Sequence, residues 1–203
     1  MCSLQKISDK NATEKIPGND SGNKGGMMRY LLKSGVLCEE KGTKILSRIK
    51  HTIWCTSKTV ILSDDTPILK ITIRDPDTSE DKRGNKRFRE YVMLDRNDTL
   101  IAVGYPAYAE GEDPDRNGWP ICRMPRVDHA IVQIAEATFL LTMHDNRHYS
   151  LEDRDGQKIL QIIHMGLSGG WLLEDEYDFR PELLSGLFVF CRFIEQENEF
   201  MIV

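Results

Sequence analysis

Short segments in which apolar and polar residues alternate make up most of this chain. From Tyr30 onward, apolar runs recur between turns that are rich in Asp, Asn and Gly. Successive side chains of a β-strand point to opposite faces of a sheet, so this alternation is typical of half-buried strands. The pattern predicts an antiparallel β meander.

Four of these hairpins repeat one spacing of strand, turn and returning strand. The copies are Leu151, Asp153, Gly156 and Ile159; Met93, Asp95, Asp98 and Ile101; Leu37, Glu39, Gly42 and Ile45; and a looser one with Leu62, Asp64 and Pro67. Asp side chains accept hydrogen bonds from the next backbone N–H groups, and Gly or Asn tolerates a positive φ. The repeat therefore predicts tight turns between paired strands.

Further strands are expected in the second half of the chain. Phe139–Met143 is expected to pair with His148–Leu151, and another strand is expected at Trp171–Leu173. The segment Val127–Ala137 has a spacing that suits a helix, whereas its IVQI core suits a strand. The neighbouring hairpins favour the strand.

The C-terminal segment Pro181–Phe200 has a different pattern. Between Leu183 and Ile194, nine of twelve residues are apolar, and they cover every side of a 3.6-residue helix. A helix that is apolar all round must be buried on all sides. Spanning a membrane takes about 20 such residues, so this run is too short.

The strands and the helix together predict a mainly β fold. A closed antiparallel β-barrel of about twelve strands around a central hydrophobic C-terminal helix removes the sheet edges and buries the helix. We expect one domain over residues 29–203. Residues 1–28 are polar and lack periodicity, so we expect them to be disordered.

The hairpins with Asp-x-x-Gly turns, the passage HYSLEDRDGQKILQIIHMGLSGGW and the C-terminal PELLSGLFVFCRFIEQENEF resemble the tubby C-terminal-like domains. This superfamily includes the LURP-one-related proteins and the phospholipid scramblases, and the short, acidic chain looks most like its bacterial branch. The resemblance covers about residues 31–200 and implies a twelve-stranded barrel threaded by a hydrophobic helix. Tubby proteins bind phosphoinositides through basic residues in a surface groove, which do not match this sequence residue by residue. The cysteine-rich and calcium-binding features of the scramblases are absent from the sequence.

Charge and cysteine content narrow the function classes. The net charge is −5 and the pI is about 5.6, which argues against broad nucleic-acid binding. The five cysteines are scattered and form no CxxC pair, which fits a reducing compartment. With neither a signal peptide nor a transmembrane run, we expect a cytoplasmic protein without a cofactor. The sequence does not define an oligomeric state.

One basic segment suggests a ligand. Lys82, Arg83, Lys86, Arg87 and Arg89 lie close together without an intervening acid. Attraction to anionic lipid is worth about 1 kcal/mol per basic residue near the surface, so this segment alone predicts a weak tether. The expected function is a non-catalytic module that binds anionic lipid headgroups, and the simpler alternative is a solvated loop. A protein-interaction domain that uses the acidic loop Glu110–Asp115 and Trp119 is another alternative.

Catalytic and metal-binding patterns are weak in this sequence. His144, Asp145, His148 and His164 are the densest group of potential metal ligands, but zinc requires three or four ligands with fixed geometry. Ser168 lies in a GLSGG string that matches a nucleophile elbow, yet a strand is expected after it instead of the required helix. The acidic turns and the cluster Glu174–Asp178 are more simply exposed loops than calcium or catalytic sites. A hydrolase is therefore the least favoured hypothesis.

Overall fold

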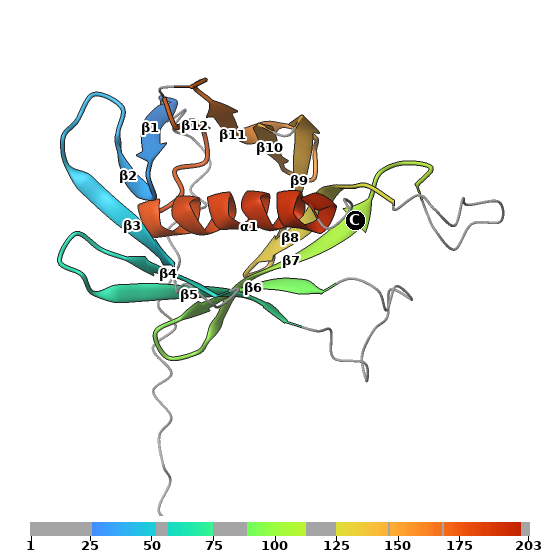
Figure 1. Cartoon of the computed structure of the whole chain (residues 1–203), viewed down its shortest axis with the longest axis horizontal. Helices are drawn as coiled ribbons and strands as arrows, with labels where there is room; N and C mark the ends of the chain where they lie inside the picture. Colours follow the sequence, from blue (N-terminus) through green and yellow to red (C-terminus); the bar gives the residue numbers. More distant parts are fainter. Residues whose placement is uncertain are drawn as a thin grey trace, which may run out of the picture.

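The computed structural model describes residues 26–51, 57–74, 89–112, 125–145, 147–167 and 169–199. These residues form twelve β-strands followed by one α-helix (Figure 1). The strands are β1 (Met28–Lys33), β2 (Val36–Glu39), β3 (Ile45–His51), β4 (Lys58–Ile61), β5 (Pro67–Arg74), β6 (Glu90–Asp95), β7 (Leu100–Tyr108), β8 (Val127–Ile134), β9 (Ala137–Asp145), β10 (His148–Glu152), β11 (Lys158–His164) and β12 (Trp171–Asp175). Each strand pairs antiparallel with the next, and β1 pairs with β12 to close the barrel. The predicted closed barrel is confirmed, and Val127–Ile134 is a strand, as the neighbouring hairpins indicated.

The helix α1 (Pro181–Glu199) fills the inside of this barrel. Figure 1 shows it between β1 and β9–β12 on one side and β3–β6 on the other. Every side chain from Leu183 to Cys191 is buried, so the helix is covered on all faces. The prediction of a central hydrophobic helix is therefore confirmed.

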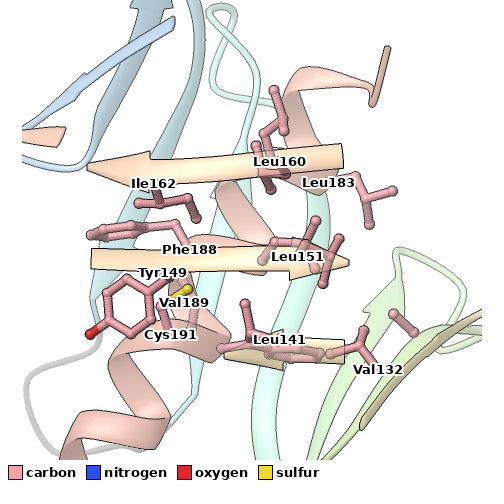
Figure 2. Close-up of a cluster of buried hydrophobic side chains, with 14 of the residues drawn as sticks. Val132, Leu141, Tyr149, Leu151, Leu160, Ile162, Leu183, Phe188, Val189 and Cys191 are labelled. Carbon is pink, nitrogen blue, oxygen red and sulfur yellow. The ribbon is translucent and has the colours of Figure 1, made fainter. Parts of the chain in front are cut away.

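Apolar side chains from opposite walls of the barrel meet α1. Figure 2 shows Phe188, Val189 and Cys191 beside Tyr149 and other core side chains of β9–β11. From the other wall, the Tyr91 ring lies 5.7 Å from the Phe190 ring and 5.3 Å from the Phe193 ring. This core occupies the space that a ligand cavity inside the barrel would need.

Small residues set how closely α1 approaches the strands. A Cβ added to Gly186 would lie 2.4 Å from Sδ of Met93, so only glycine fits there without a shift. The hydroxyls of Ser47 and Ser185 share a buried hydrogen bond of 2.8 Å between β3 and α1. Both contacts fix the position of the helix relative to the wall.

The repeated aspartate turns form as the sequence predicts. Oδ1 of Asp95 accepts hydrogen bonds from the N–H groups of Asn97 (2.7 Å) and Thr99 (2.8 Å). Oδ1 of Asp153 accepts them in the same way from Asp155 and Gln157, both at 2.9 Å. These bonds lower the pKa of Asp95, with the Thr99 N–H as the largest cause. The turn aspartates therefore stabilise their hairpins.

The fourth copy of the repeat is a hairpin, but its predicted alignment is wrong by two residues. The N–H of Leu62 donates to the Thr66 carbonyl and the N–H of Asp65 donates to the Leu62 carbonyl. Asp95 makes this same pair of backbone bonds in its own turn, so Leu62, and not Asp64, occupies the equivalent position. Asp65 supplies the positive φ, at 64°.

The connections between strands divide between two ends of the barrel. The turns after β2, β4, β6, β8 and β10 lie at one end, which we call the aspartate-turn end. The connections after β1, β3, β5, β7, β9 and β11 lie at the other, which we call the rim end. The helix runs toward the rim end, where the Asn198 side chain bonds both the N–H (3.0 Å) and the carbonyl (2.8 Å) of Val127.

The predicted disordered segment, residues 1–28, lies almost wholly outside the described residues. Strand β1 begins at Met28, which pairs with Asp175 of β12. The barrel therefore starts one residue before the predicted domain boundary.

Candidate functional site

Two open hollows lie next to each other at the rim end of the barrel. The first, of about 420 Å³, is lined by Arg126, His144, Asp145, Arg147 and His148. The second, of about 400 Å³, is lined by Arg147, His164, Gly166, Leu167, Trp171, Arg192 and Glu195. Arg147 belongs to both, so the two hollows form one continuous surface, which we call the cationic rim.

The short turn between β9 and β10 positions Arg147. Oδ1 of Asp145 accepts the Arg147 N–H at 2.8 Å, and the Asp145 carboxylate accepts the Nδ1–H of His148 at 2.8 Å. The hydrogen bond from His148 is the main reason that the pKa of Asp145 is lowered. Among the described residues that line the first hollow, Asp145 is the only carboxylate, and its own turn already supplies it with hydrogen-bond donors.

Neither Arg126 nor Arg147 has a carboxylate partner for its guanidinium within the described part of the chain. Arg126 is held by its backbone, because its N–H donates to Oε2 of Glu112 at 2.5 Å just before β8 begins. Both side chains are exposed. Two arginines thus line one hollow, and neither forms an ion pair in the described part of the chain, which leaves their N–H donors available to an anion.

The histidines of the first hollow have partners of their own. Nε2 of His144 shares a hydrogen bond of 2.8 Å with the Ser150 hydroxyl, and His148 binds Asp145. Across the ranges described above, no three His, Cys, Asp or Glu side chains come together as a metal site would require. The predicted cluster of His144, Asp145, His148 and His164 is instead divided between the two hollows.

The second hollow is built on the C-terminal part of α1. Glu195 accepts a hydrogen bond from the Tyr149 hydroxyl and is paired with Arg192, one turn earlier on the helix. Burial is the main cause that raises the pKa of Tyr149, so its hydroxyl stays protonated and donates to Glu195. The Glu195 carboxylate, which lines the second hollow, is therefore already bonded to Tyr149 and Arg192.

Trp171 connects the rim to the core. Its ring lies 4.9 Å from the His164 ring and 5.2 Å from the Phe188 ring of α1, centroid to centroid. Because Phe188 is buried in the barrel, Trp171 packs against the core and also lines the second hollow.

A glycine-rich turn joins β11 to β12 above Trp171. The N–H of Met165 donates to the Gly170 carbonyl at 2.8 Å, which closes the turn. Gly166 has φ 76° and Gly170 has φ 100°, and a Cβ on Gly170 would lie 2.6 Å from the Leu32 carbonyl oxygen. The side chain of Leu167, at the outside of this turn, is fully exposed. Ser168 lies outside the described residues, and the element after it is strand β12, so the context of a nucleophile elbow is missing.

Most of the predicted lipid-binding residues cannot be placed. Lys82, Arg83, Lys86 and Arg87 lie outside the described residues. Nη2 of Arg89 lies 3.6 Å from Oε1 of Glu197 on α1, and Arg89 lines neither hollow. The sequence analysis missed Arg126, Arg147 and Arg192, because they lie far apart in the chain and only the closed barrel brings them together.

The predicted acidic clusters serve the fold or lie outside the described residues. Oε1 of Glu174 pairs with Arg29 at 2.7 Å, and buried Asp175 accepts the N–H groups of Tyr177 and Phe179. Of the Glu110–Asp115 loop only 110–112 are described, and Trp119 is not.

No protein-family model, curated protein or solved structure matches the chain. The resemblance to the tubby C-terminal-like domains therefore stays a prediction. In the described part of the chain, no helix combines the length and the apolar character needed to cross a membrane.

Proposed function

We propose that this protein is a non-catalytic binding module that recognises phosphate-bearing anions at the cationic rim, foremost the headgroups of anionic phospholipids. The observation that carries the proposal is the first hollow, where Arg126 and Arg147 are exposed without a carboxylate partner in the described ranges. Arginine presents a planar fork of N–H donors that matches phosphate oxygens.

The distribution of charge supports an anionic ligand. The whole chain carries a net charge of −5. Two neighbouring arginines without an ion pair in the described ranges therefore differ in charge from the average of the protein. The carboxylates that line the hollows, Asp145 and Glu195, are engaged by His148 and Arg192. A local positive potential on an acidic protein favours selective binding at one place over general attraction.

The architecture directs binding to the outside. The lumen is filled by α1, whose side chains from Leu183 to Cys191 are buried. Strand β5 ends and strand β6 begins at the rim end, which is also the end where the two hollows lie. The resemblance to tubby-like domains, which include phosphoinositide-binding proteins, supports the same class of ligand.

The first prediction concerns vesicle binding. Each basic residue near an anionic surface contributes about 1 kcal/mol, so the double variant Arg126→Gln/Arg147→Gln should lose about 2 kcal/mol, roughly a 30-fold fall in partitioning. We expect wild-type protein to sediment with vesicles of phosphatidylcholine containing phosphatidylserine or a phosphoinositide, and the binding to weaken with salt.

Arg154→Gln is the matched control, because Arg154 is exposed in the β10–β11 turn at the aspartate-turn end. It should bind like wild type. Equal binding to neutral and anionic vesicles, or unchanged binding of the double variant, would remove the proposal. Competition by inorganic tripolyphosphate shows whether phosphate alone is recognised.

A role in protein interaction would have a candidate surface on the outer wall of the described barrel. Ile131 and Leu140 are directly paired across β8 and β9 on the outer wall and are 43% and 37% exposed. A stable interface buries about 800 Å² on each partner, far more than two side chains provide. The rim therefore supports the lipid proposal more strongly than the wall supports a protein partner.

A further inference from the structure

The β11–β12 turn presents apolar side chains where the proposed headgroup site lies. Leu167 is 107% exposed and Met165 is 49% exposed, the two highest values among the large hydrophobic side chains described, Met165 sharing its value with Leu100. Exposing leucine fully to water is unfavourable by the free energy of transferring its apolar surface. A fold that holds such a side chain outward in a defined turn makes it available to an apolar partner.

The backbone of this turn is built to hold that position. The Met165–Gly170 hydrogen bond closes it, and a Cβ on Gly169 would overlap the side chain of Met165 at 2.0 Å. The following residue, Trp171, packs on Phe188 of the core. The two described ends of the turn, Met165 and Gly170, are therefore held together beside Trp171.

The surroundings of Leu167 identify the partner. Leu167 lines the second hollow together with Arg147 and Arg192, beside the rings of His164 and Trp171. An apolar tip next to cations matches a bilayer with anionic headgroups, in which charge and hydrocarbon lie within a few ångströms of each other. A protein surface would need apolar area beyond this tip.

We propose that Met165 and Leu167 insert into the hydrocarbon boundary of an anionic bilayer while Arg147 and Arg192 contact its headgroups. The inference rests on the proposed function, because it assigns the anion to a lipid instead of a free phosphate. It also orients the molecule, with the rim end toward the membrane and the aspartate-turn end away from it.

The test compares Leu167→Ser with wild type on phosphatidylcholine vesicles that contain phosphatidylserine. Loss of one inserted leucine should lower partitioning on the order of tenfold. Leu167→Phe should bind at least as well as wild type, because it keeps the apolar surface. Leu100→Ser is the control, since Leu100 is 49% exposed at the aspartate-turn end, and it should not change binding.

Salt separates the two contributions. In wild type, a fraction of binding should persist at high salt, and Leu167→Ser should lose that fraction, whereas Arg147→Gln should weaken the salt-sensitive part. The concentration of inorganic tripolyphosphate that displaces the protein from vesicles should be equal for Leu167→Ser and wild type. Melting temperatures like that of wild type establish that the exposed-site variants are folded.

The outcomes distinguish the inference from the proposed function. If Leu167→Ser binds anionic vesicles as wild type does, insertion is wrong and headgroup binding stands. Wild-type protein that binds tripolyphosphate but no vesicle overturns insertion and keeps the anion site. Wild-type protein that binds neither removes both.

Discussion

Asp175 joins the barrel to its helix through one buried carboxylate. As the chain leaves β12, Asp175 is 1% exposed and accepts the N–H groups of Tyr177 at 3.0 Å and Phe179 at 2.8 Å. Burial raises its pKa from 3.8 to about 6, because desolvation disfavours the charged form more than the two hydrogen bonds favour it. The segment that leads into α1 therefore depends on a group that titrates near neutrality.

This raised pKa predicts a particular dependence of stability on pH. Between pH 3.8 and about pH 6, Asp175 binds its proton more tightly in the folded state than in the unfolded state. The stability contributed by the protonated Asp175 carboxyl is fully present below pH 3.8 and is lost as the pH rises through about 6. At about 1.4 kcal/mol per pH unit, the change amounts to about 3 kcal/mol.

Urea unfolding of wild type and Asp175→Asn from pH 4 to pH 7 checks the dependence. The difference in their free energies of unfolding should shift by about 2–3 kcal/mol in favour of the variant as the pH rises. Other titrating groups cancel in that difference. Parallel profiles for the two proteins would contradict the role assigned to Asp175.

At the scale of residues, the sequence predicts hydrogen bonds between near neighbours in the chain, but it does not predict contacts between distant residues. The turn roles of Asp95 and Asp153 follow from their own neighbours, and the structure confirms them. Leu62 makes the same backbone hydrogen bonds as Asp95 but has no side-chain acceptor. The fourth turn was therefore misaligned on Asp64, the acidic residue nearest to it. Arg147 has no local signal, because its importance depends on Arg126 and Arg192 from other strands and the helix.

At the scale of elements, α1 holds the barrel together. Leu187 is 0% exposed in the middle of the helix. Leu187→Asp places an unpaired charge in the core, at a cost of several kcal/mol against a total stability of about 5–15 kcal/mol. We expect this variant, and likewise Phe188→Asp, to be unfolded.

Circular dichroism and thermal melting check this expectation. Leu187→Met conserves volume and should lose less than about 1.5 kcal/mol, so it is the matched control. A soluble Leu187→Asp variant with a cooperative melt near that of wild type would show that the helix is not needed inside the barrel.

The contact between Gly186 and Met93 predicts a second effect on α1. Gly186→Ala gains about 1 kcal/mol of helix propensity but forces its Cβ against the buried Met93 side chain, and overpacking costs about 1–3 kcal/mol. We expect Gly186→Ala to lower the free energy of unfolding by about 1 kcal/mol. In a Met93→Ala background, where the space is open, the same change should be stabilising.

A double-mutant cycle by urea unfolding measures this coupling. Equal effects of Gly186→Ala in the two backgrounds would show that Met93 does not limit the helix position. The all-round apolar pattern of α1 predicts its burial from sequence alone. That pattern does not say which strand each helix residue faces, so the contacts to Met93 and Ser47 emerge only from the structure.

At the scale of the molecule, the two ends of the barrel differ in kind. The aspartate-turn end consists of tight hairpins whose polar groups satisfy one another. The rim end carries the two hollows that share Arg147. The sequence analysis predicted the barrel, because hairpins are local. It did not locate the cationic rim, since a surface built from three connections between strands and from the C-terminal part of α1 is defined only after the barrel closes.

Closure itself depends on the first strand. Residues Met28–Leu32 of β1 pair with residues Trp171–Asp175 of β12, and β1 buries Tyr30 and Leu32 in the core. A chain that begins at Gly35 would leave the edges of β2 and β12 unpaired, and open edges promote aggregation. By contrast, a chain that begins at Gly26 keeps every described strand.

We therefore expect the chain from Gly26 to melt like the full-length protein, and the chain from Gly35 to unfold or aggregate in size-exclusion chromatography. A synthetic peptide of residues 26–34 added to the shorter chain should restore part of the cooperative melt, because strand addition satisfies both open edges. A monomeric, cooperatively melting chain from Gly35 without the peptide would mean that the barrel tolerates a gap. In that case the helix, rather than closure of the sheet, would be the dominant source of stability, and the wall next to the gap would become a route for ligands to reach α1.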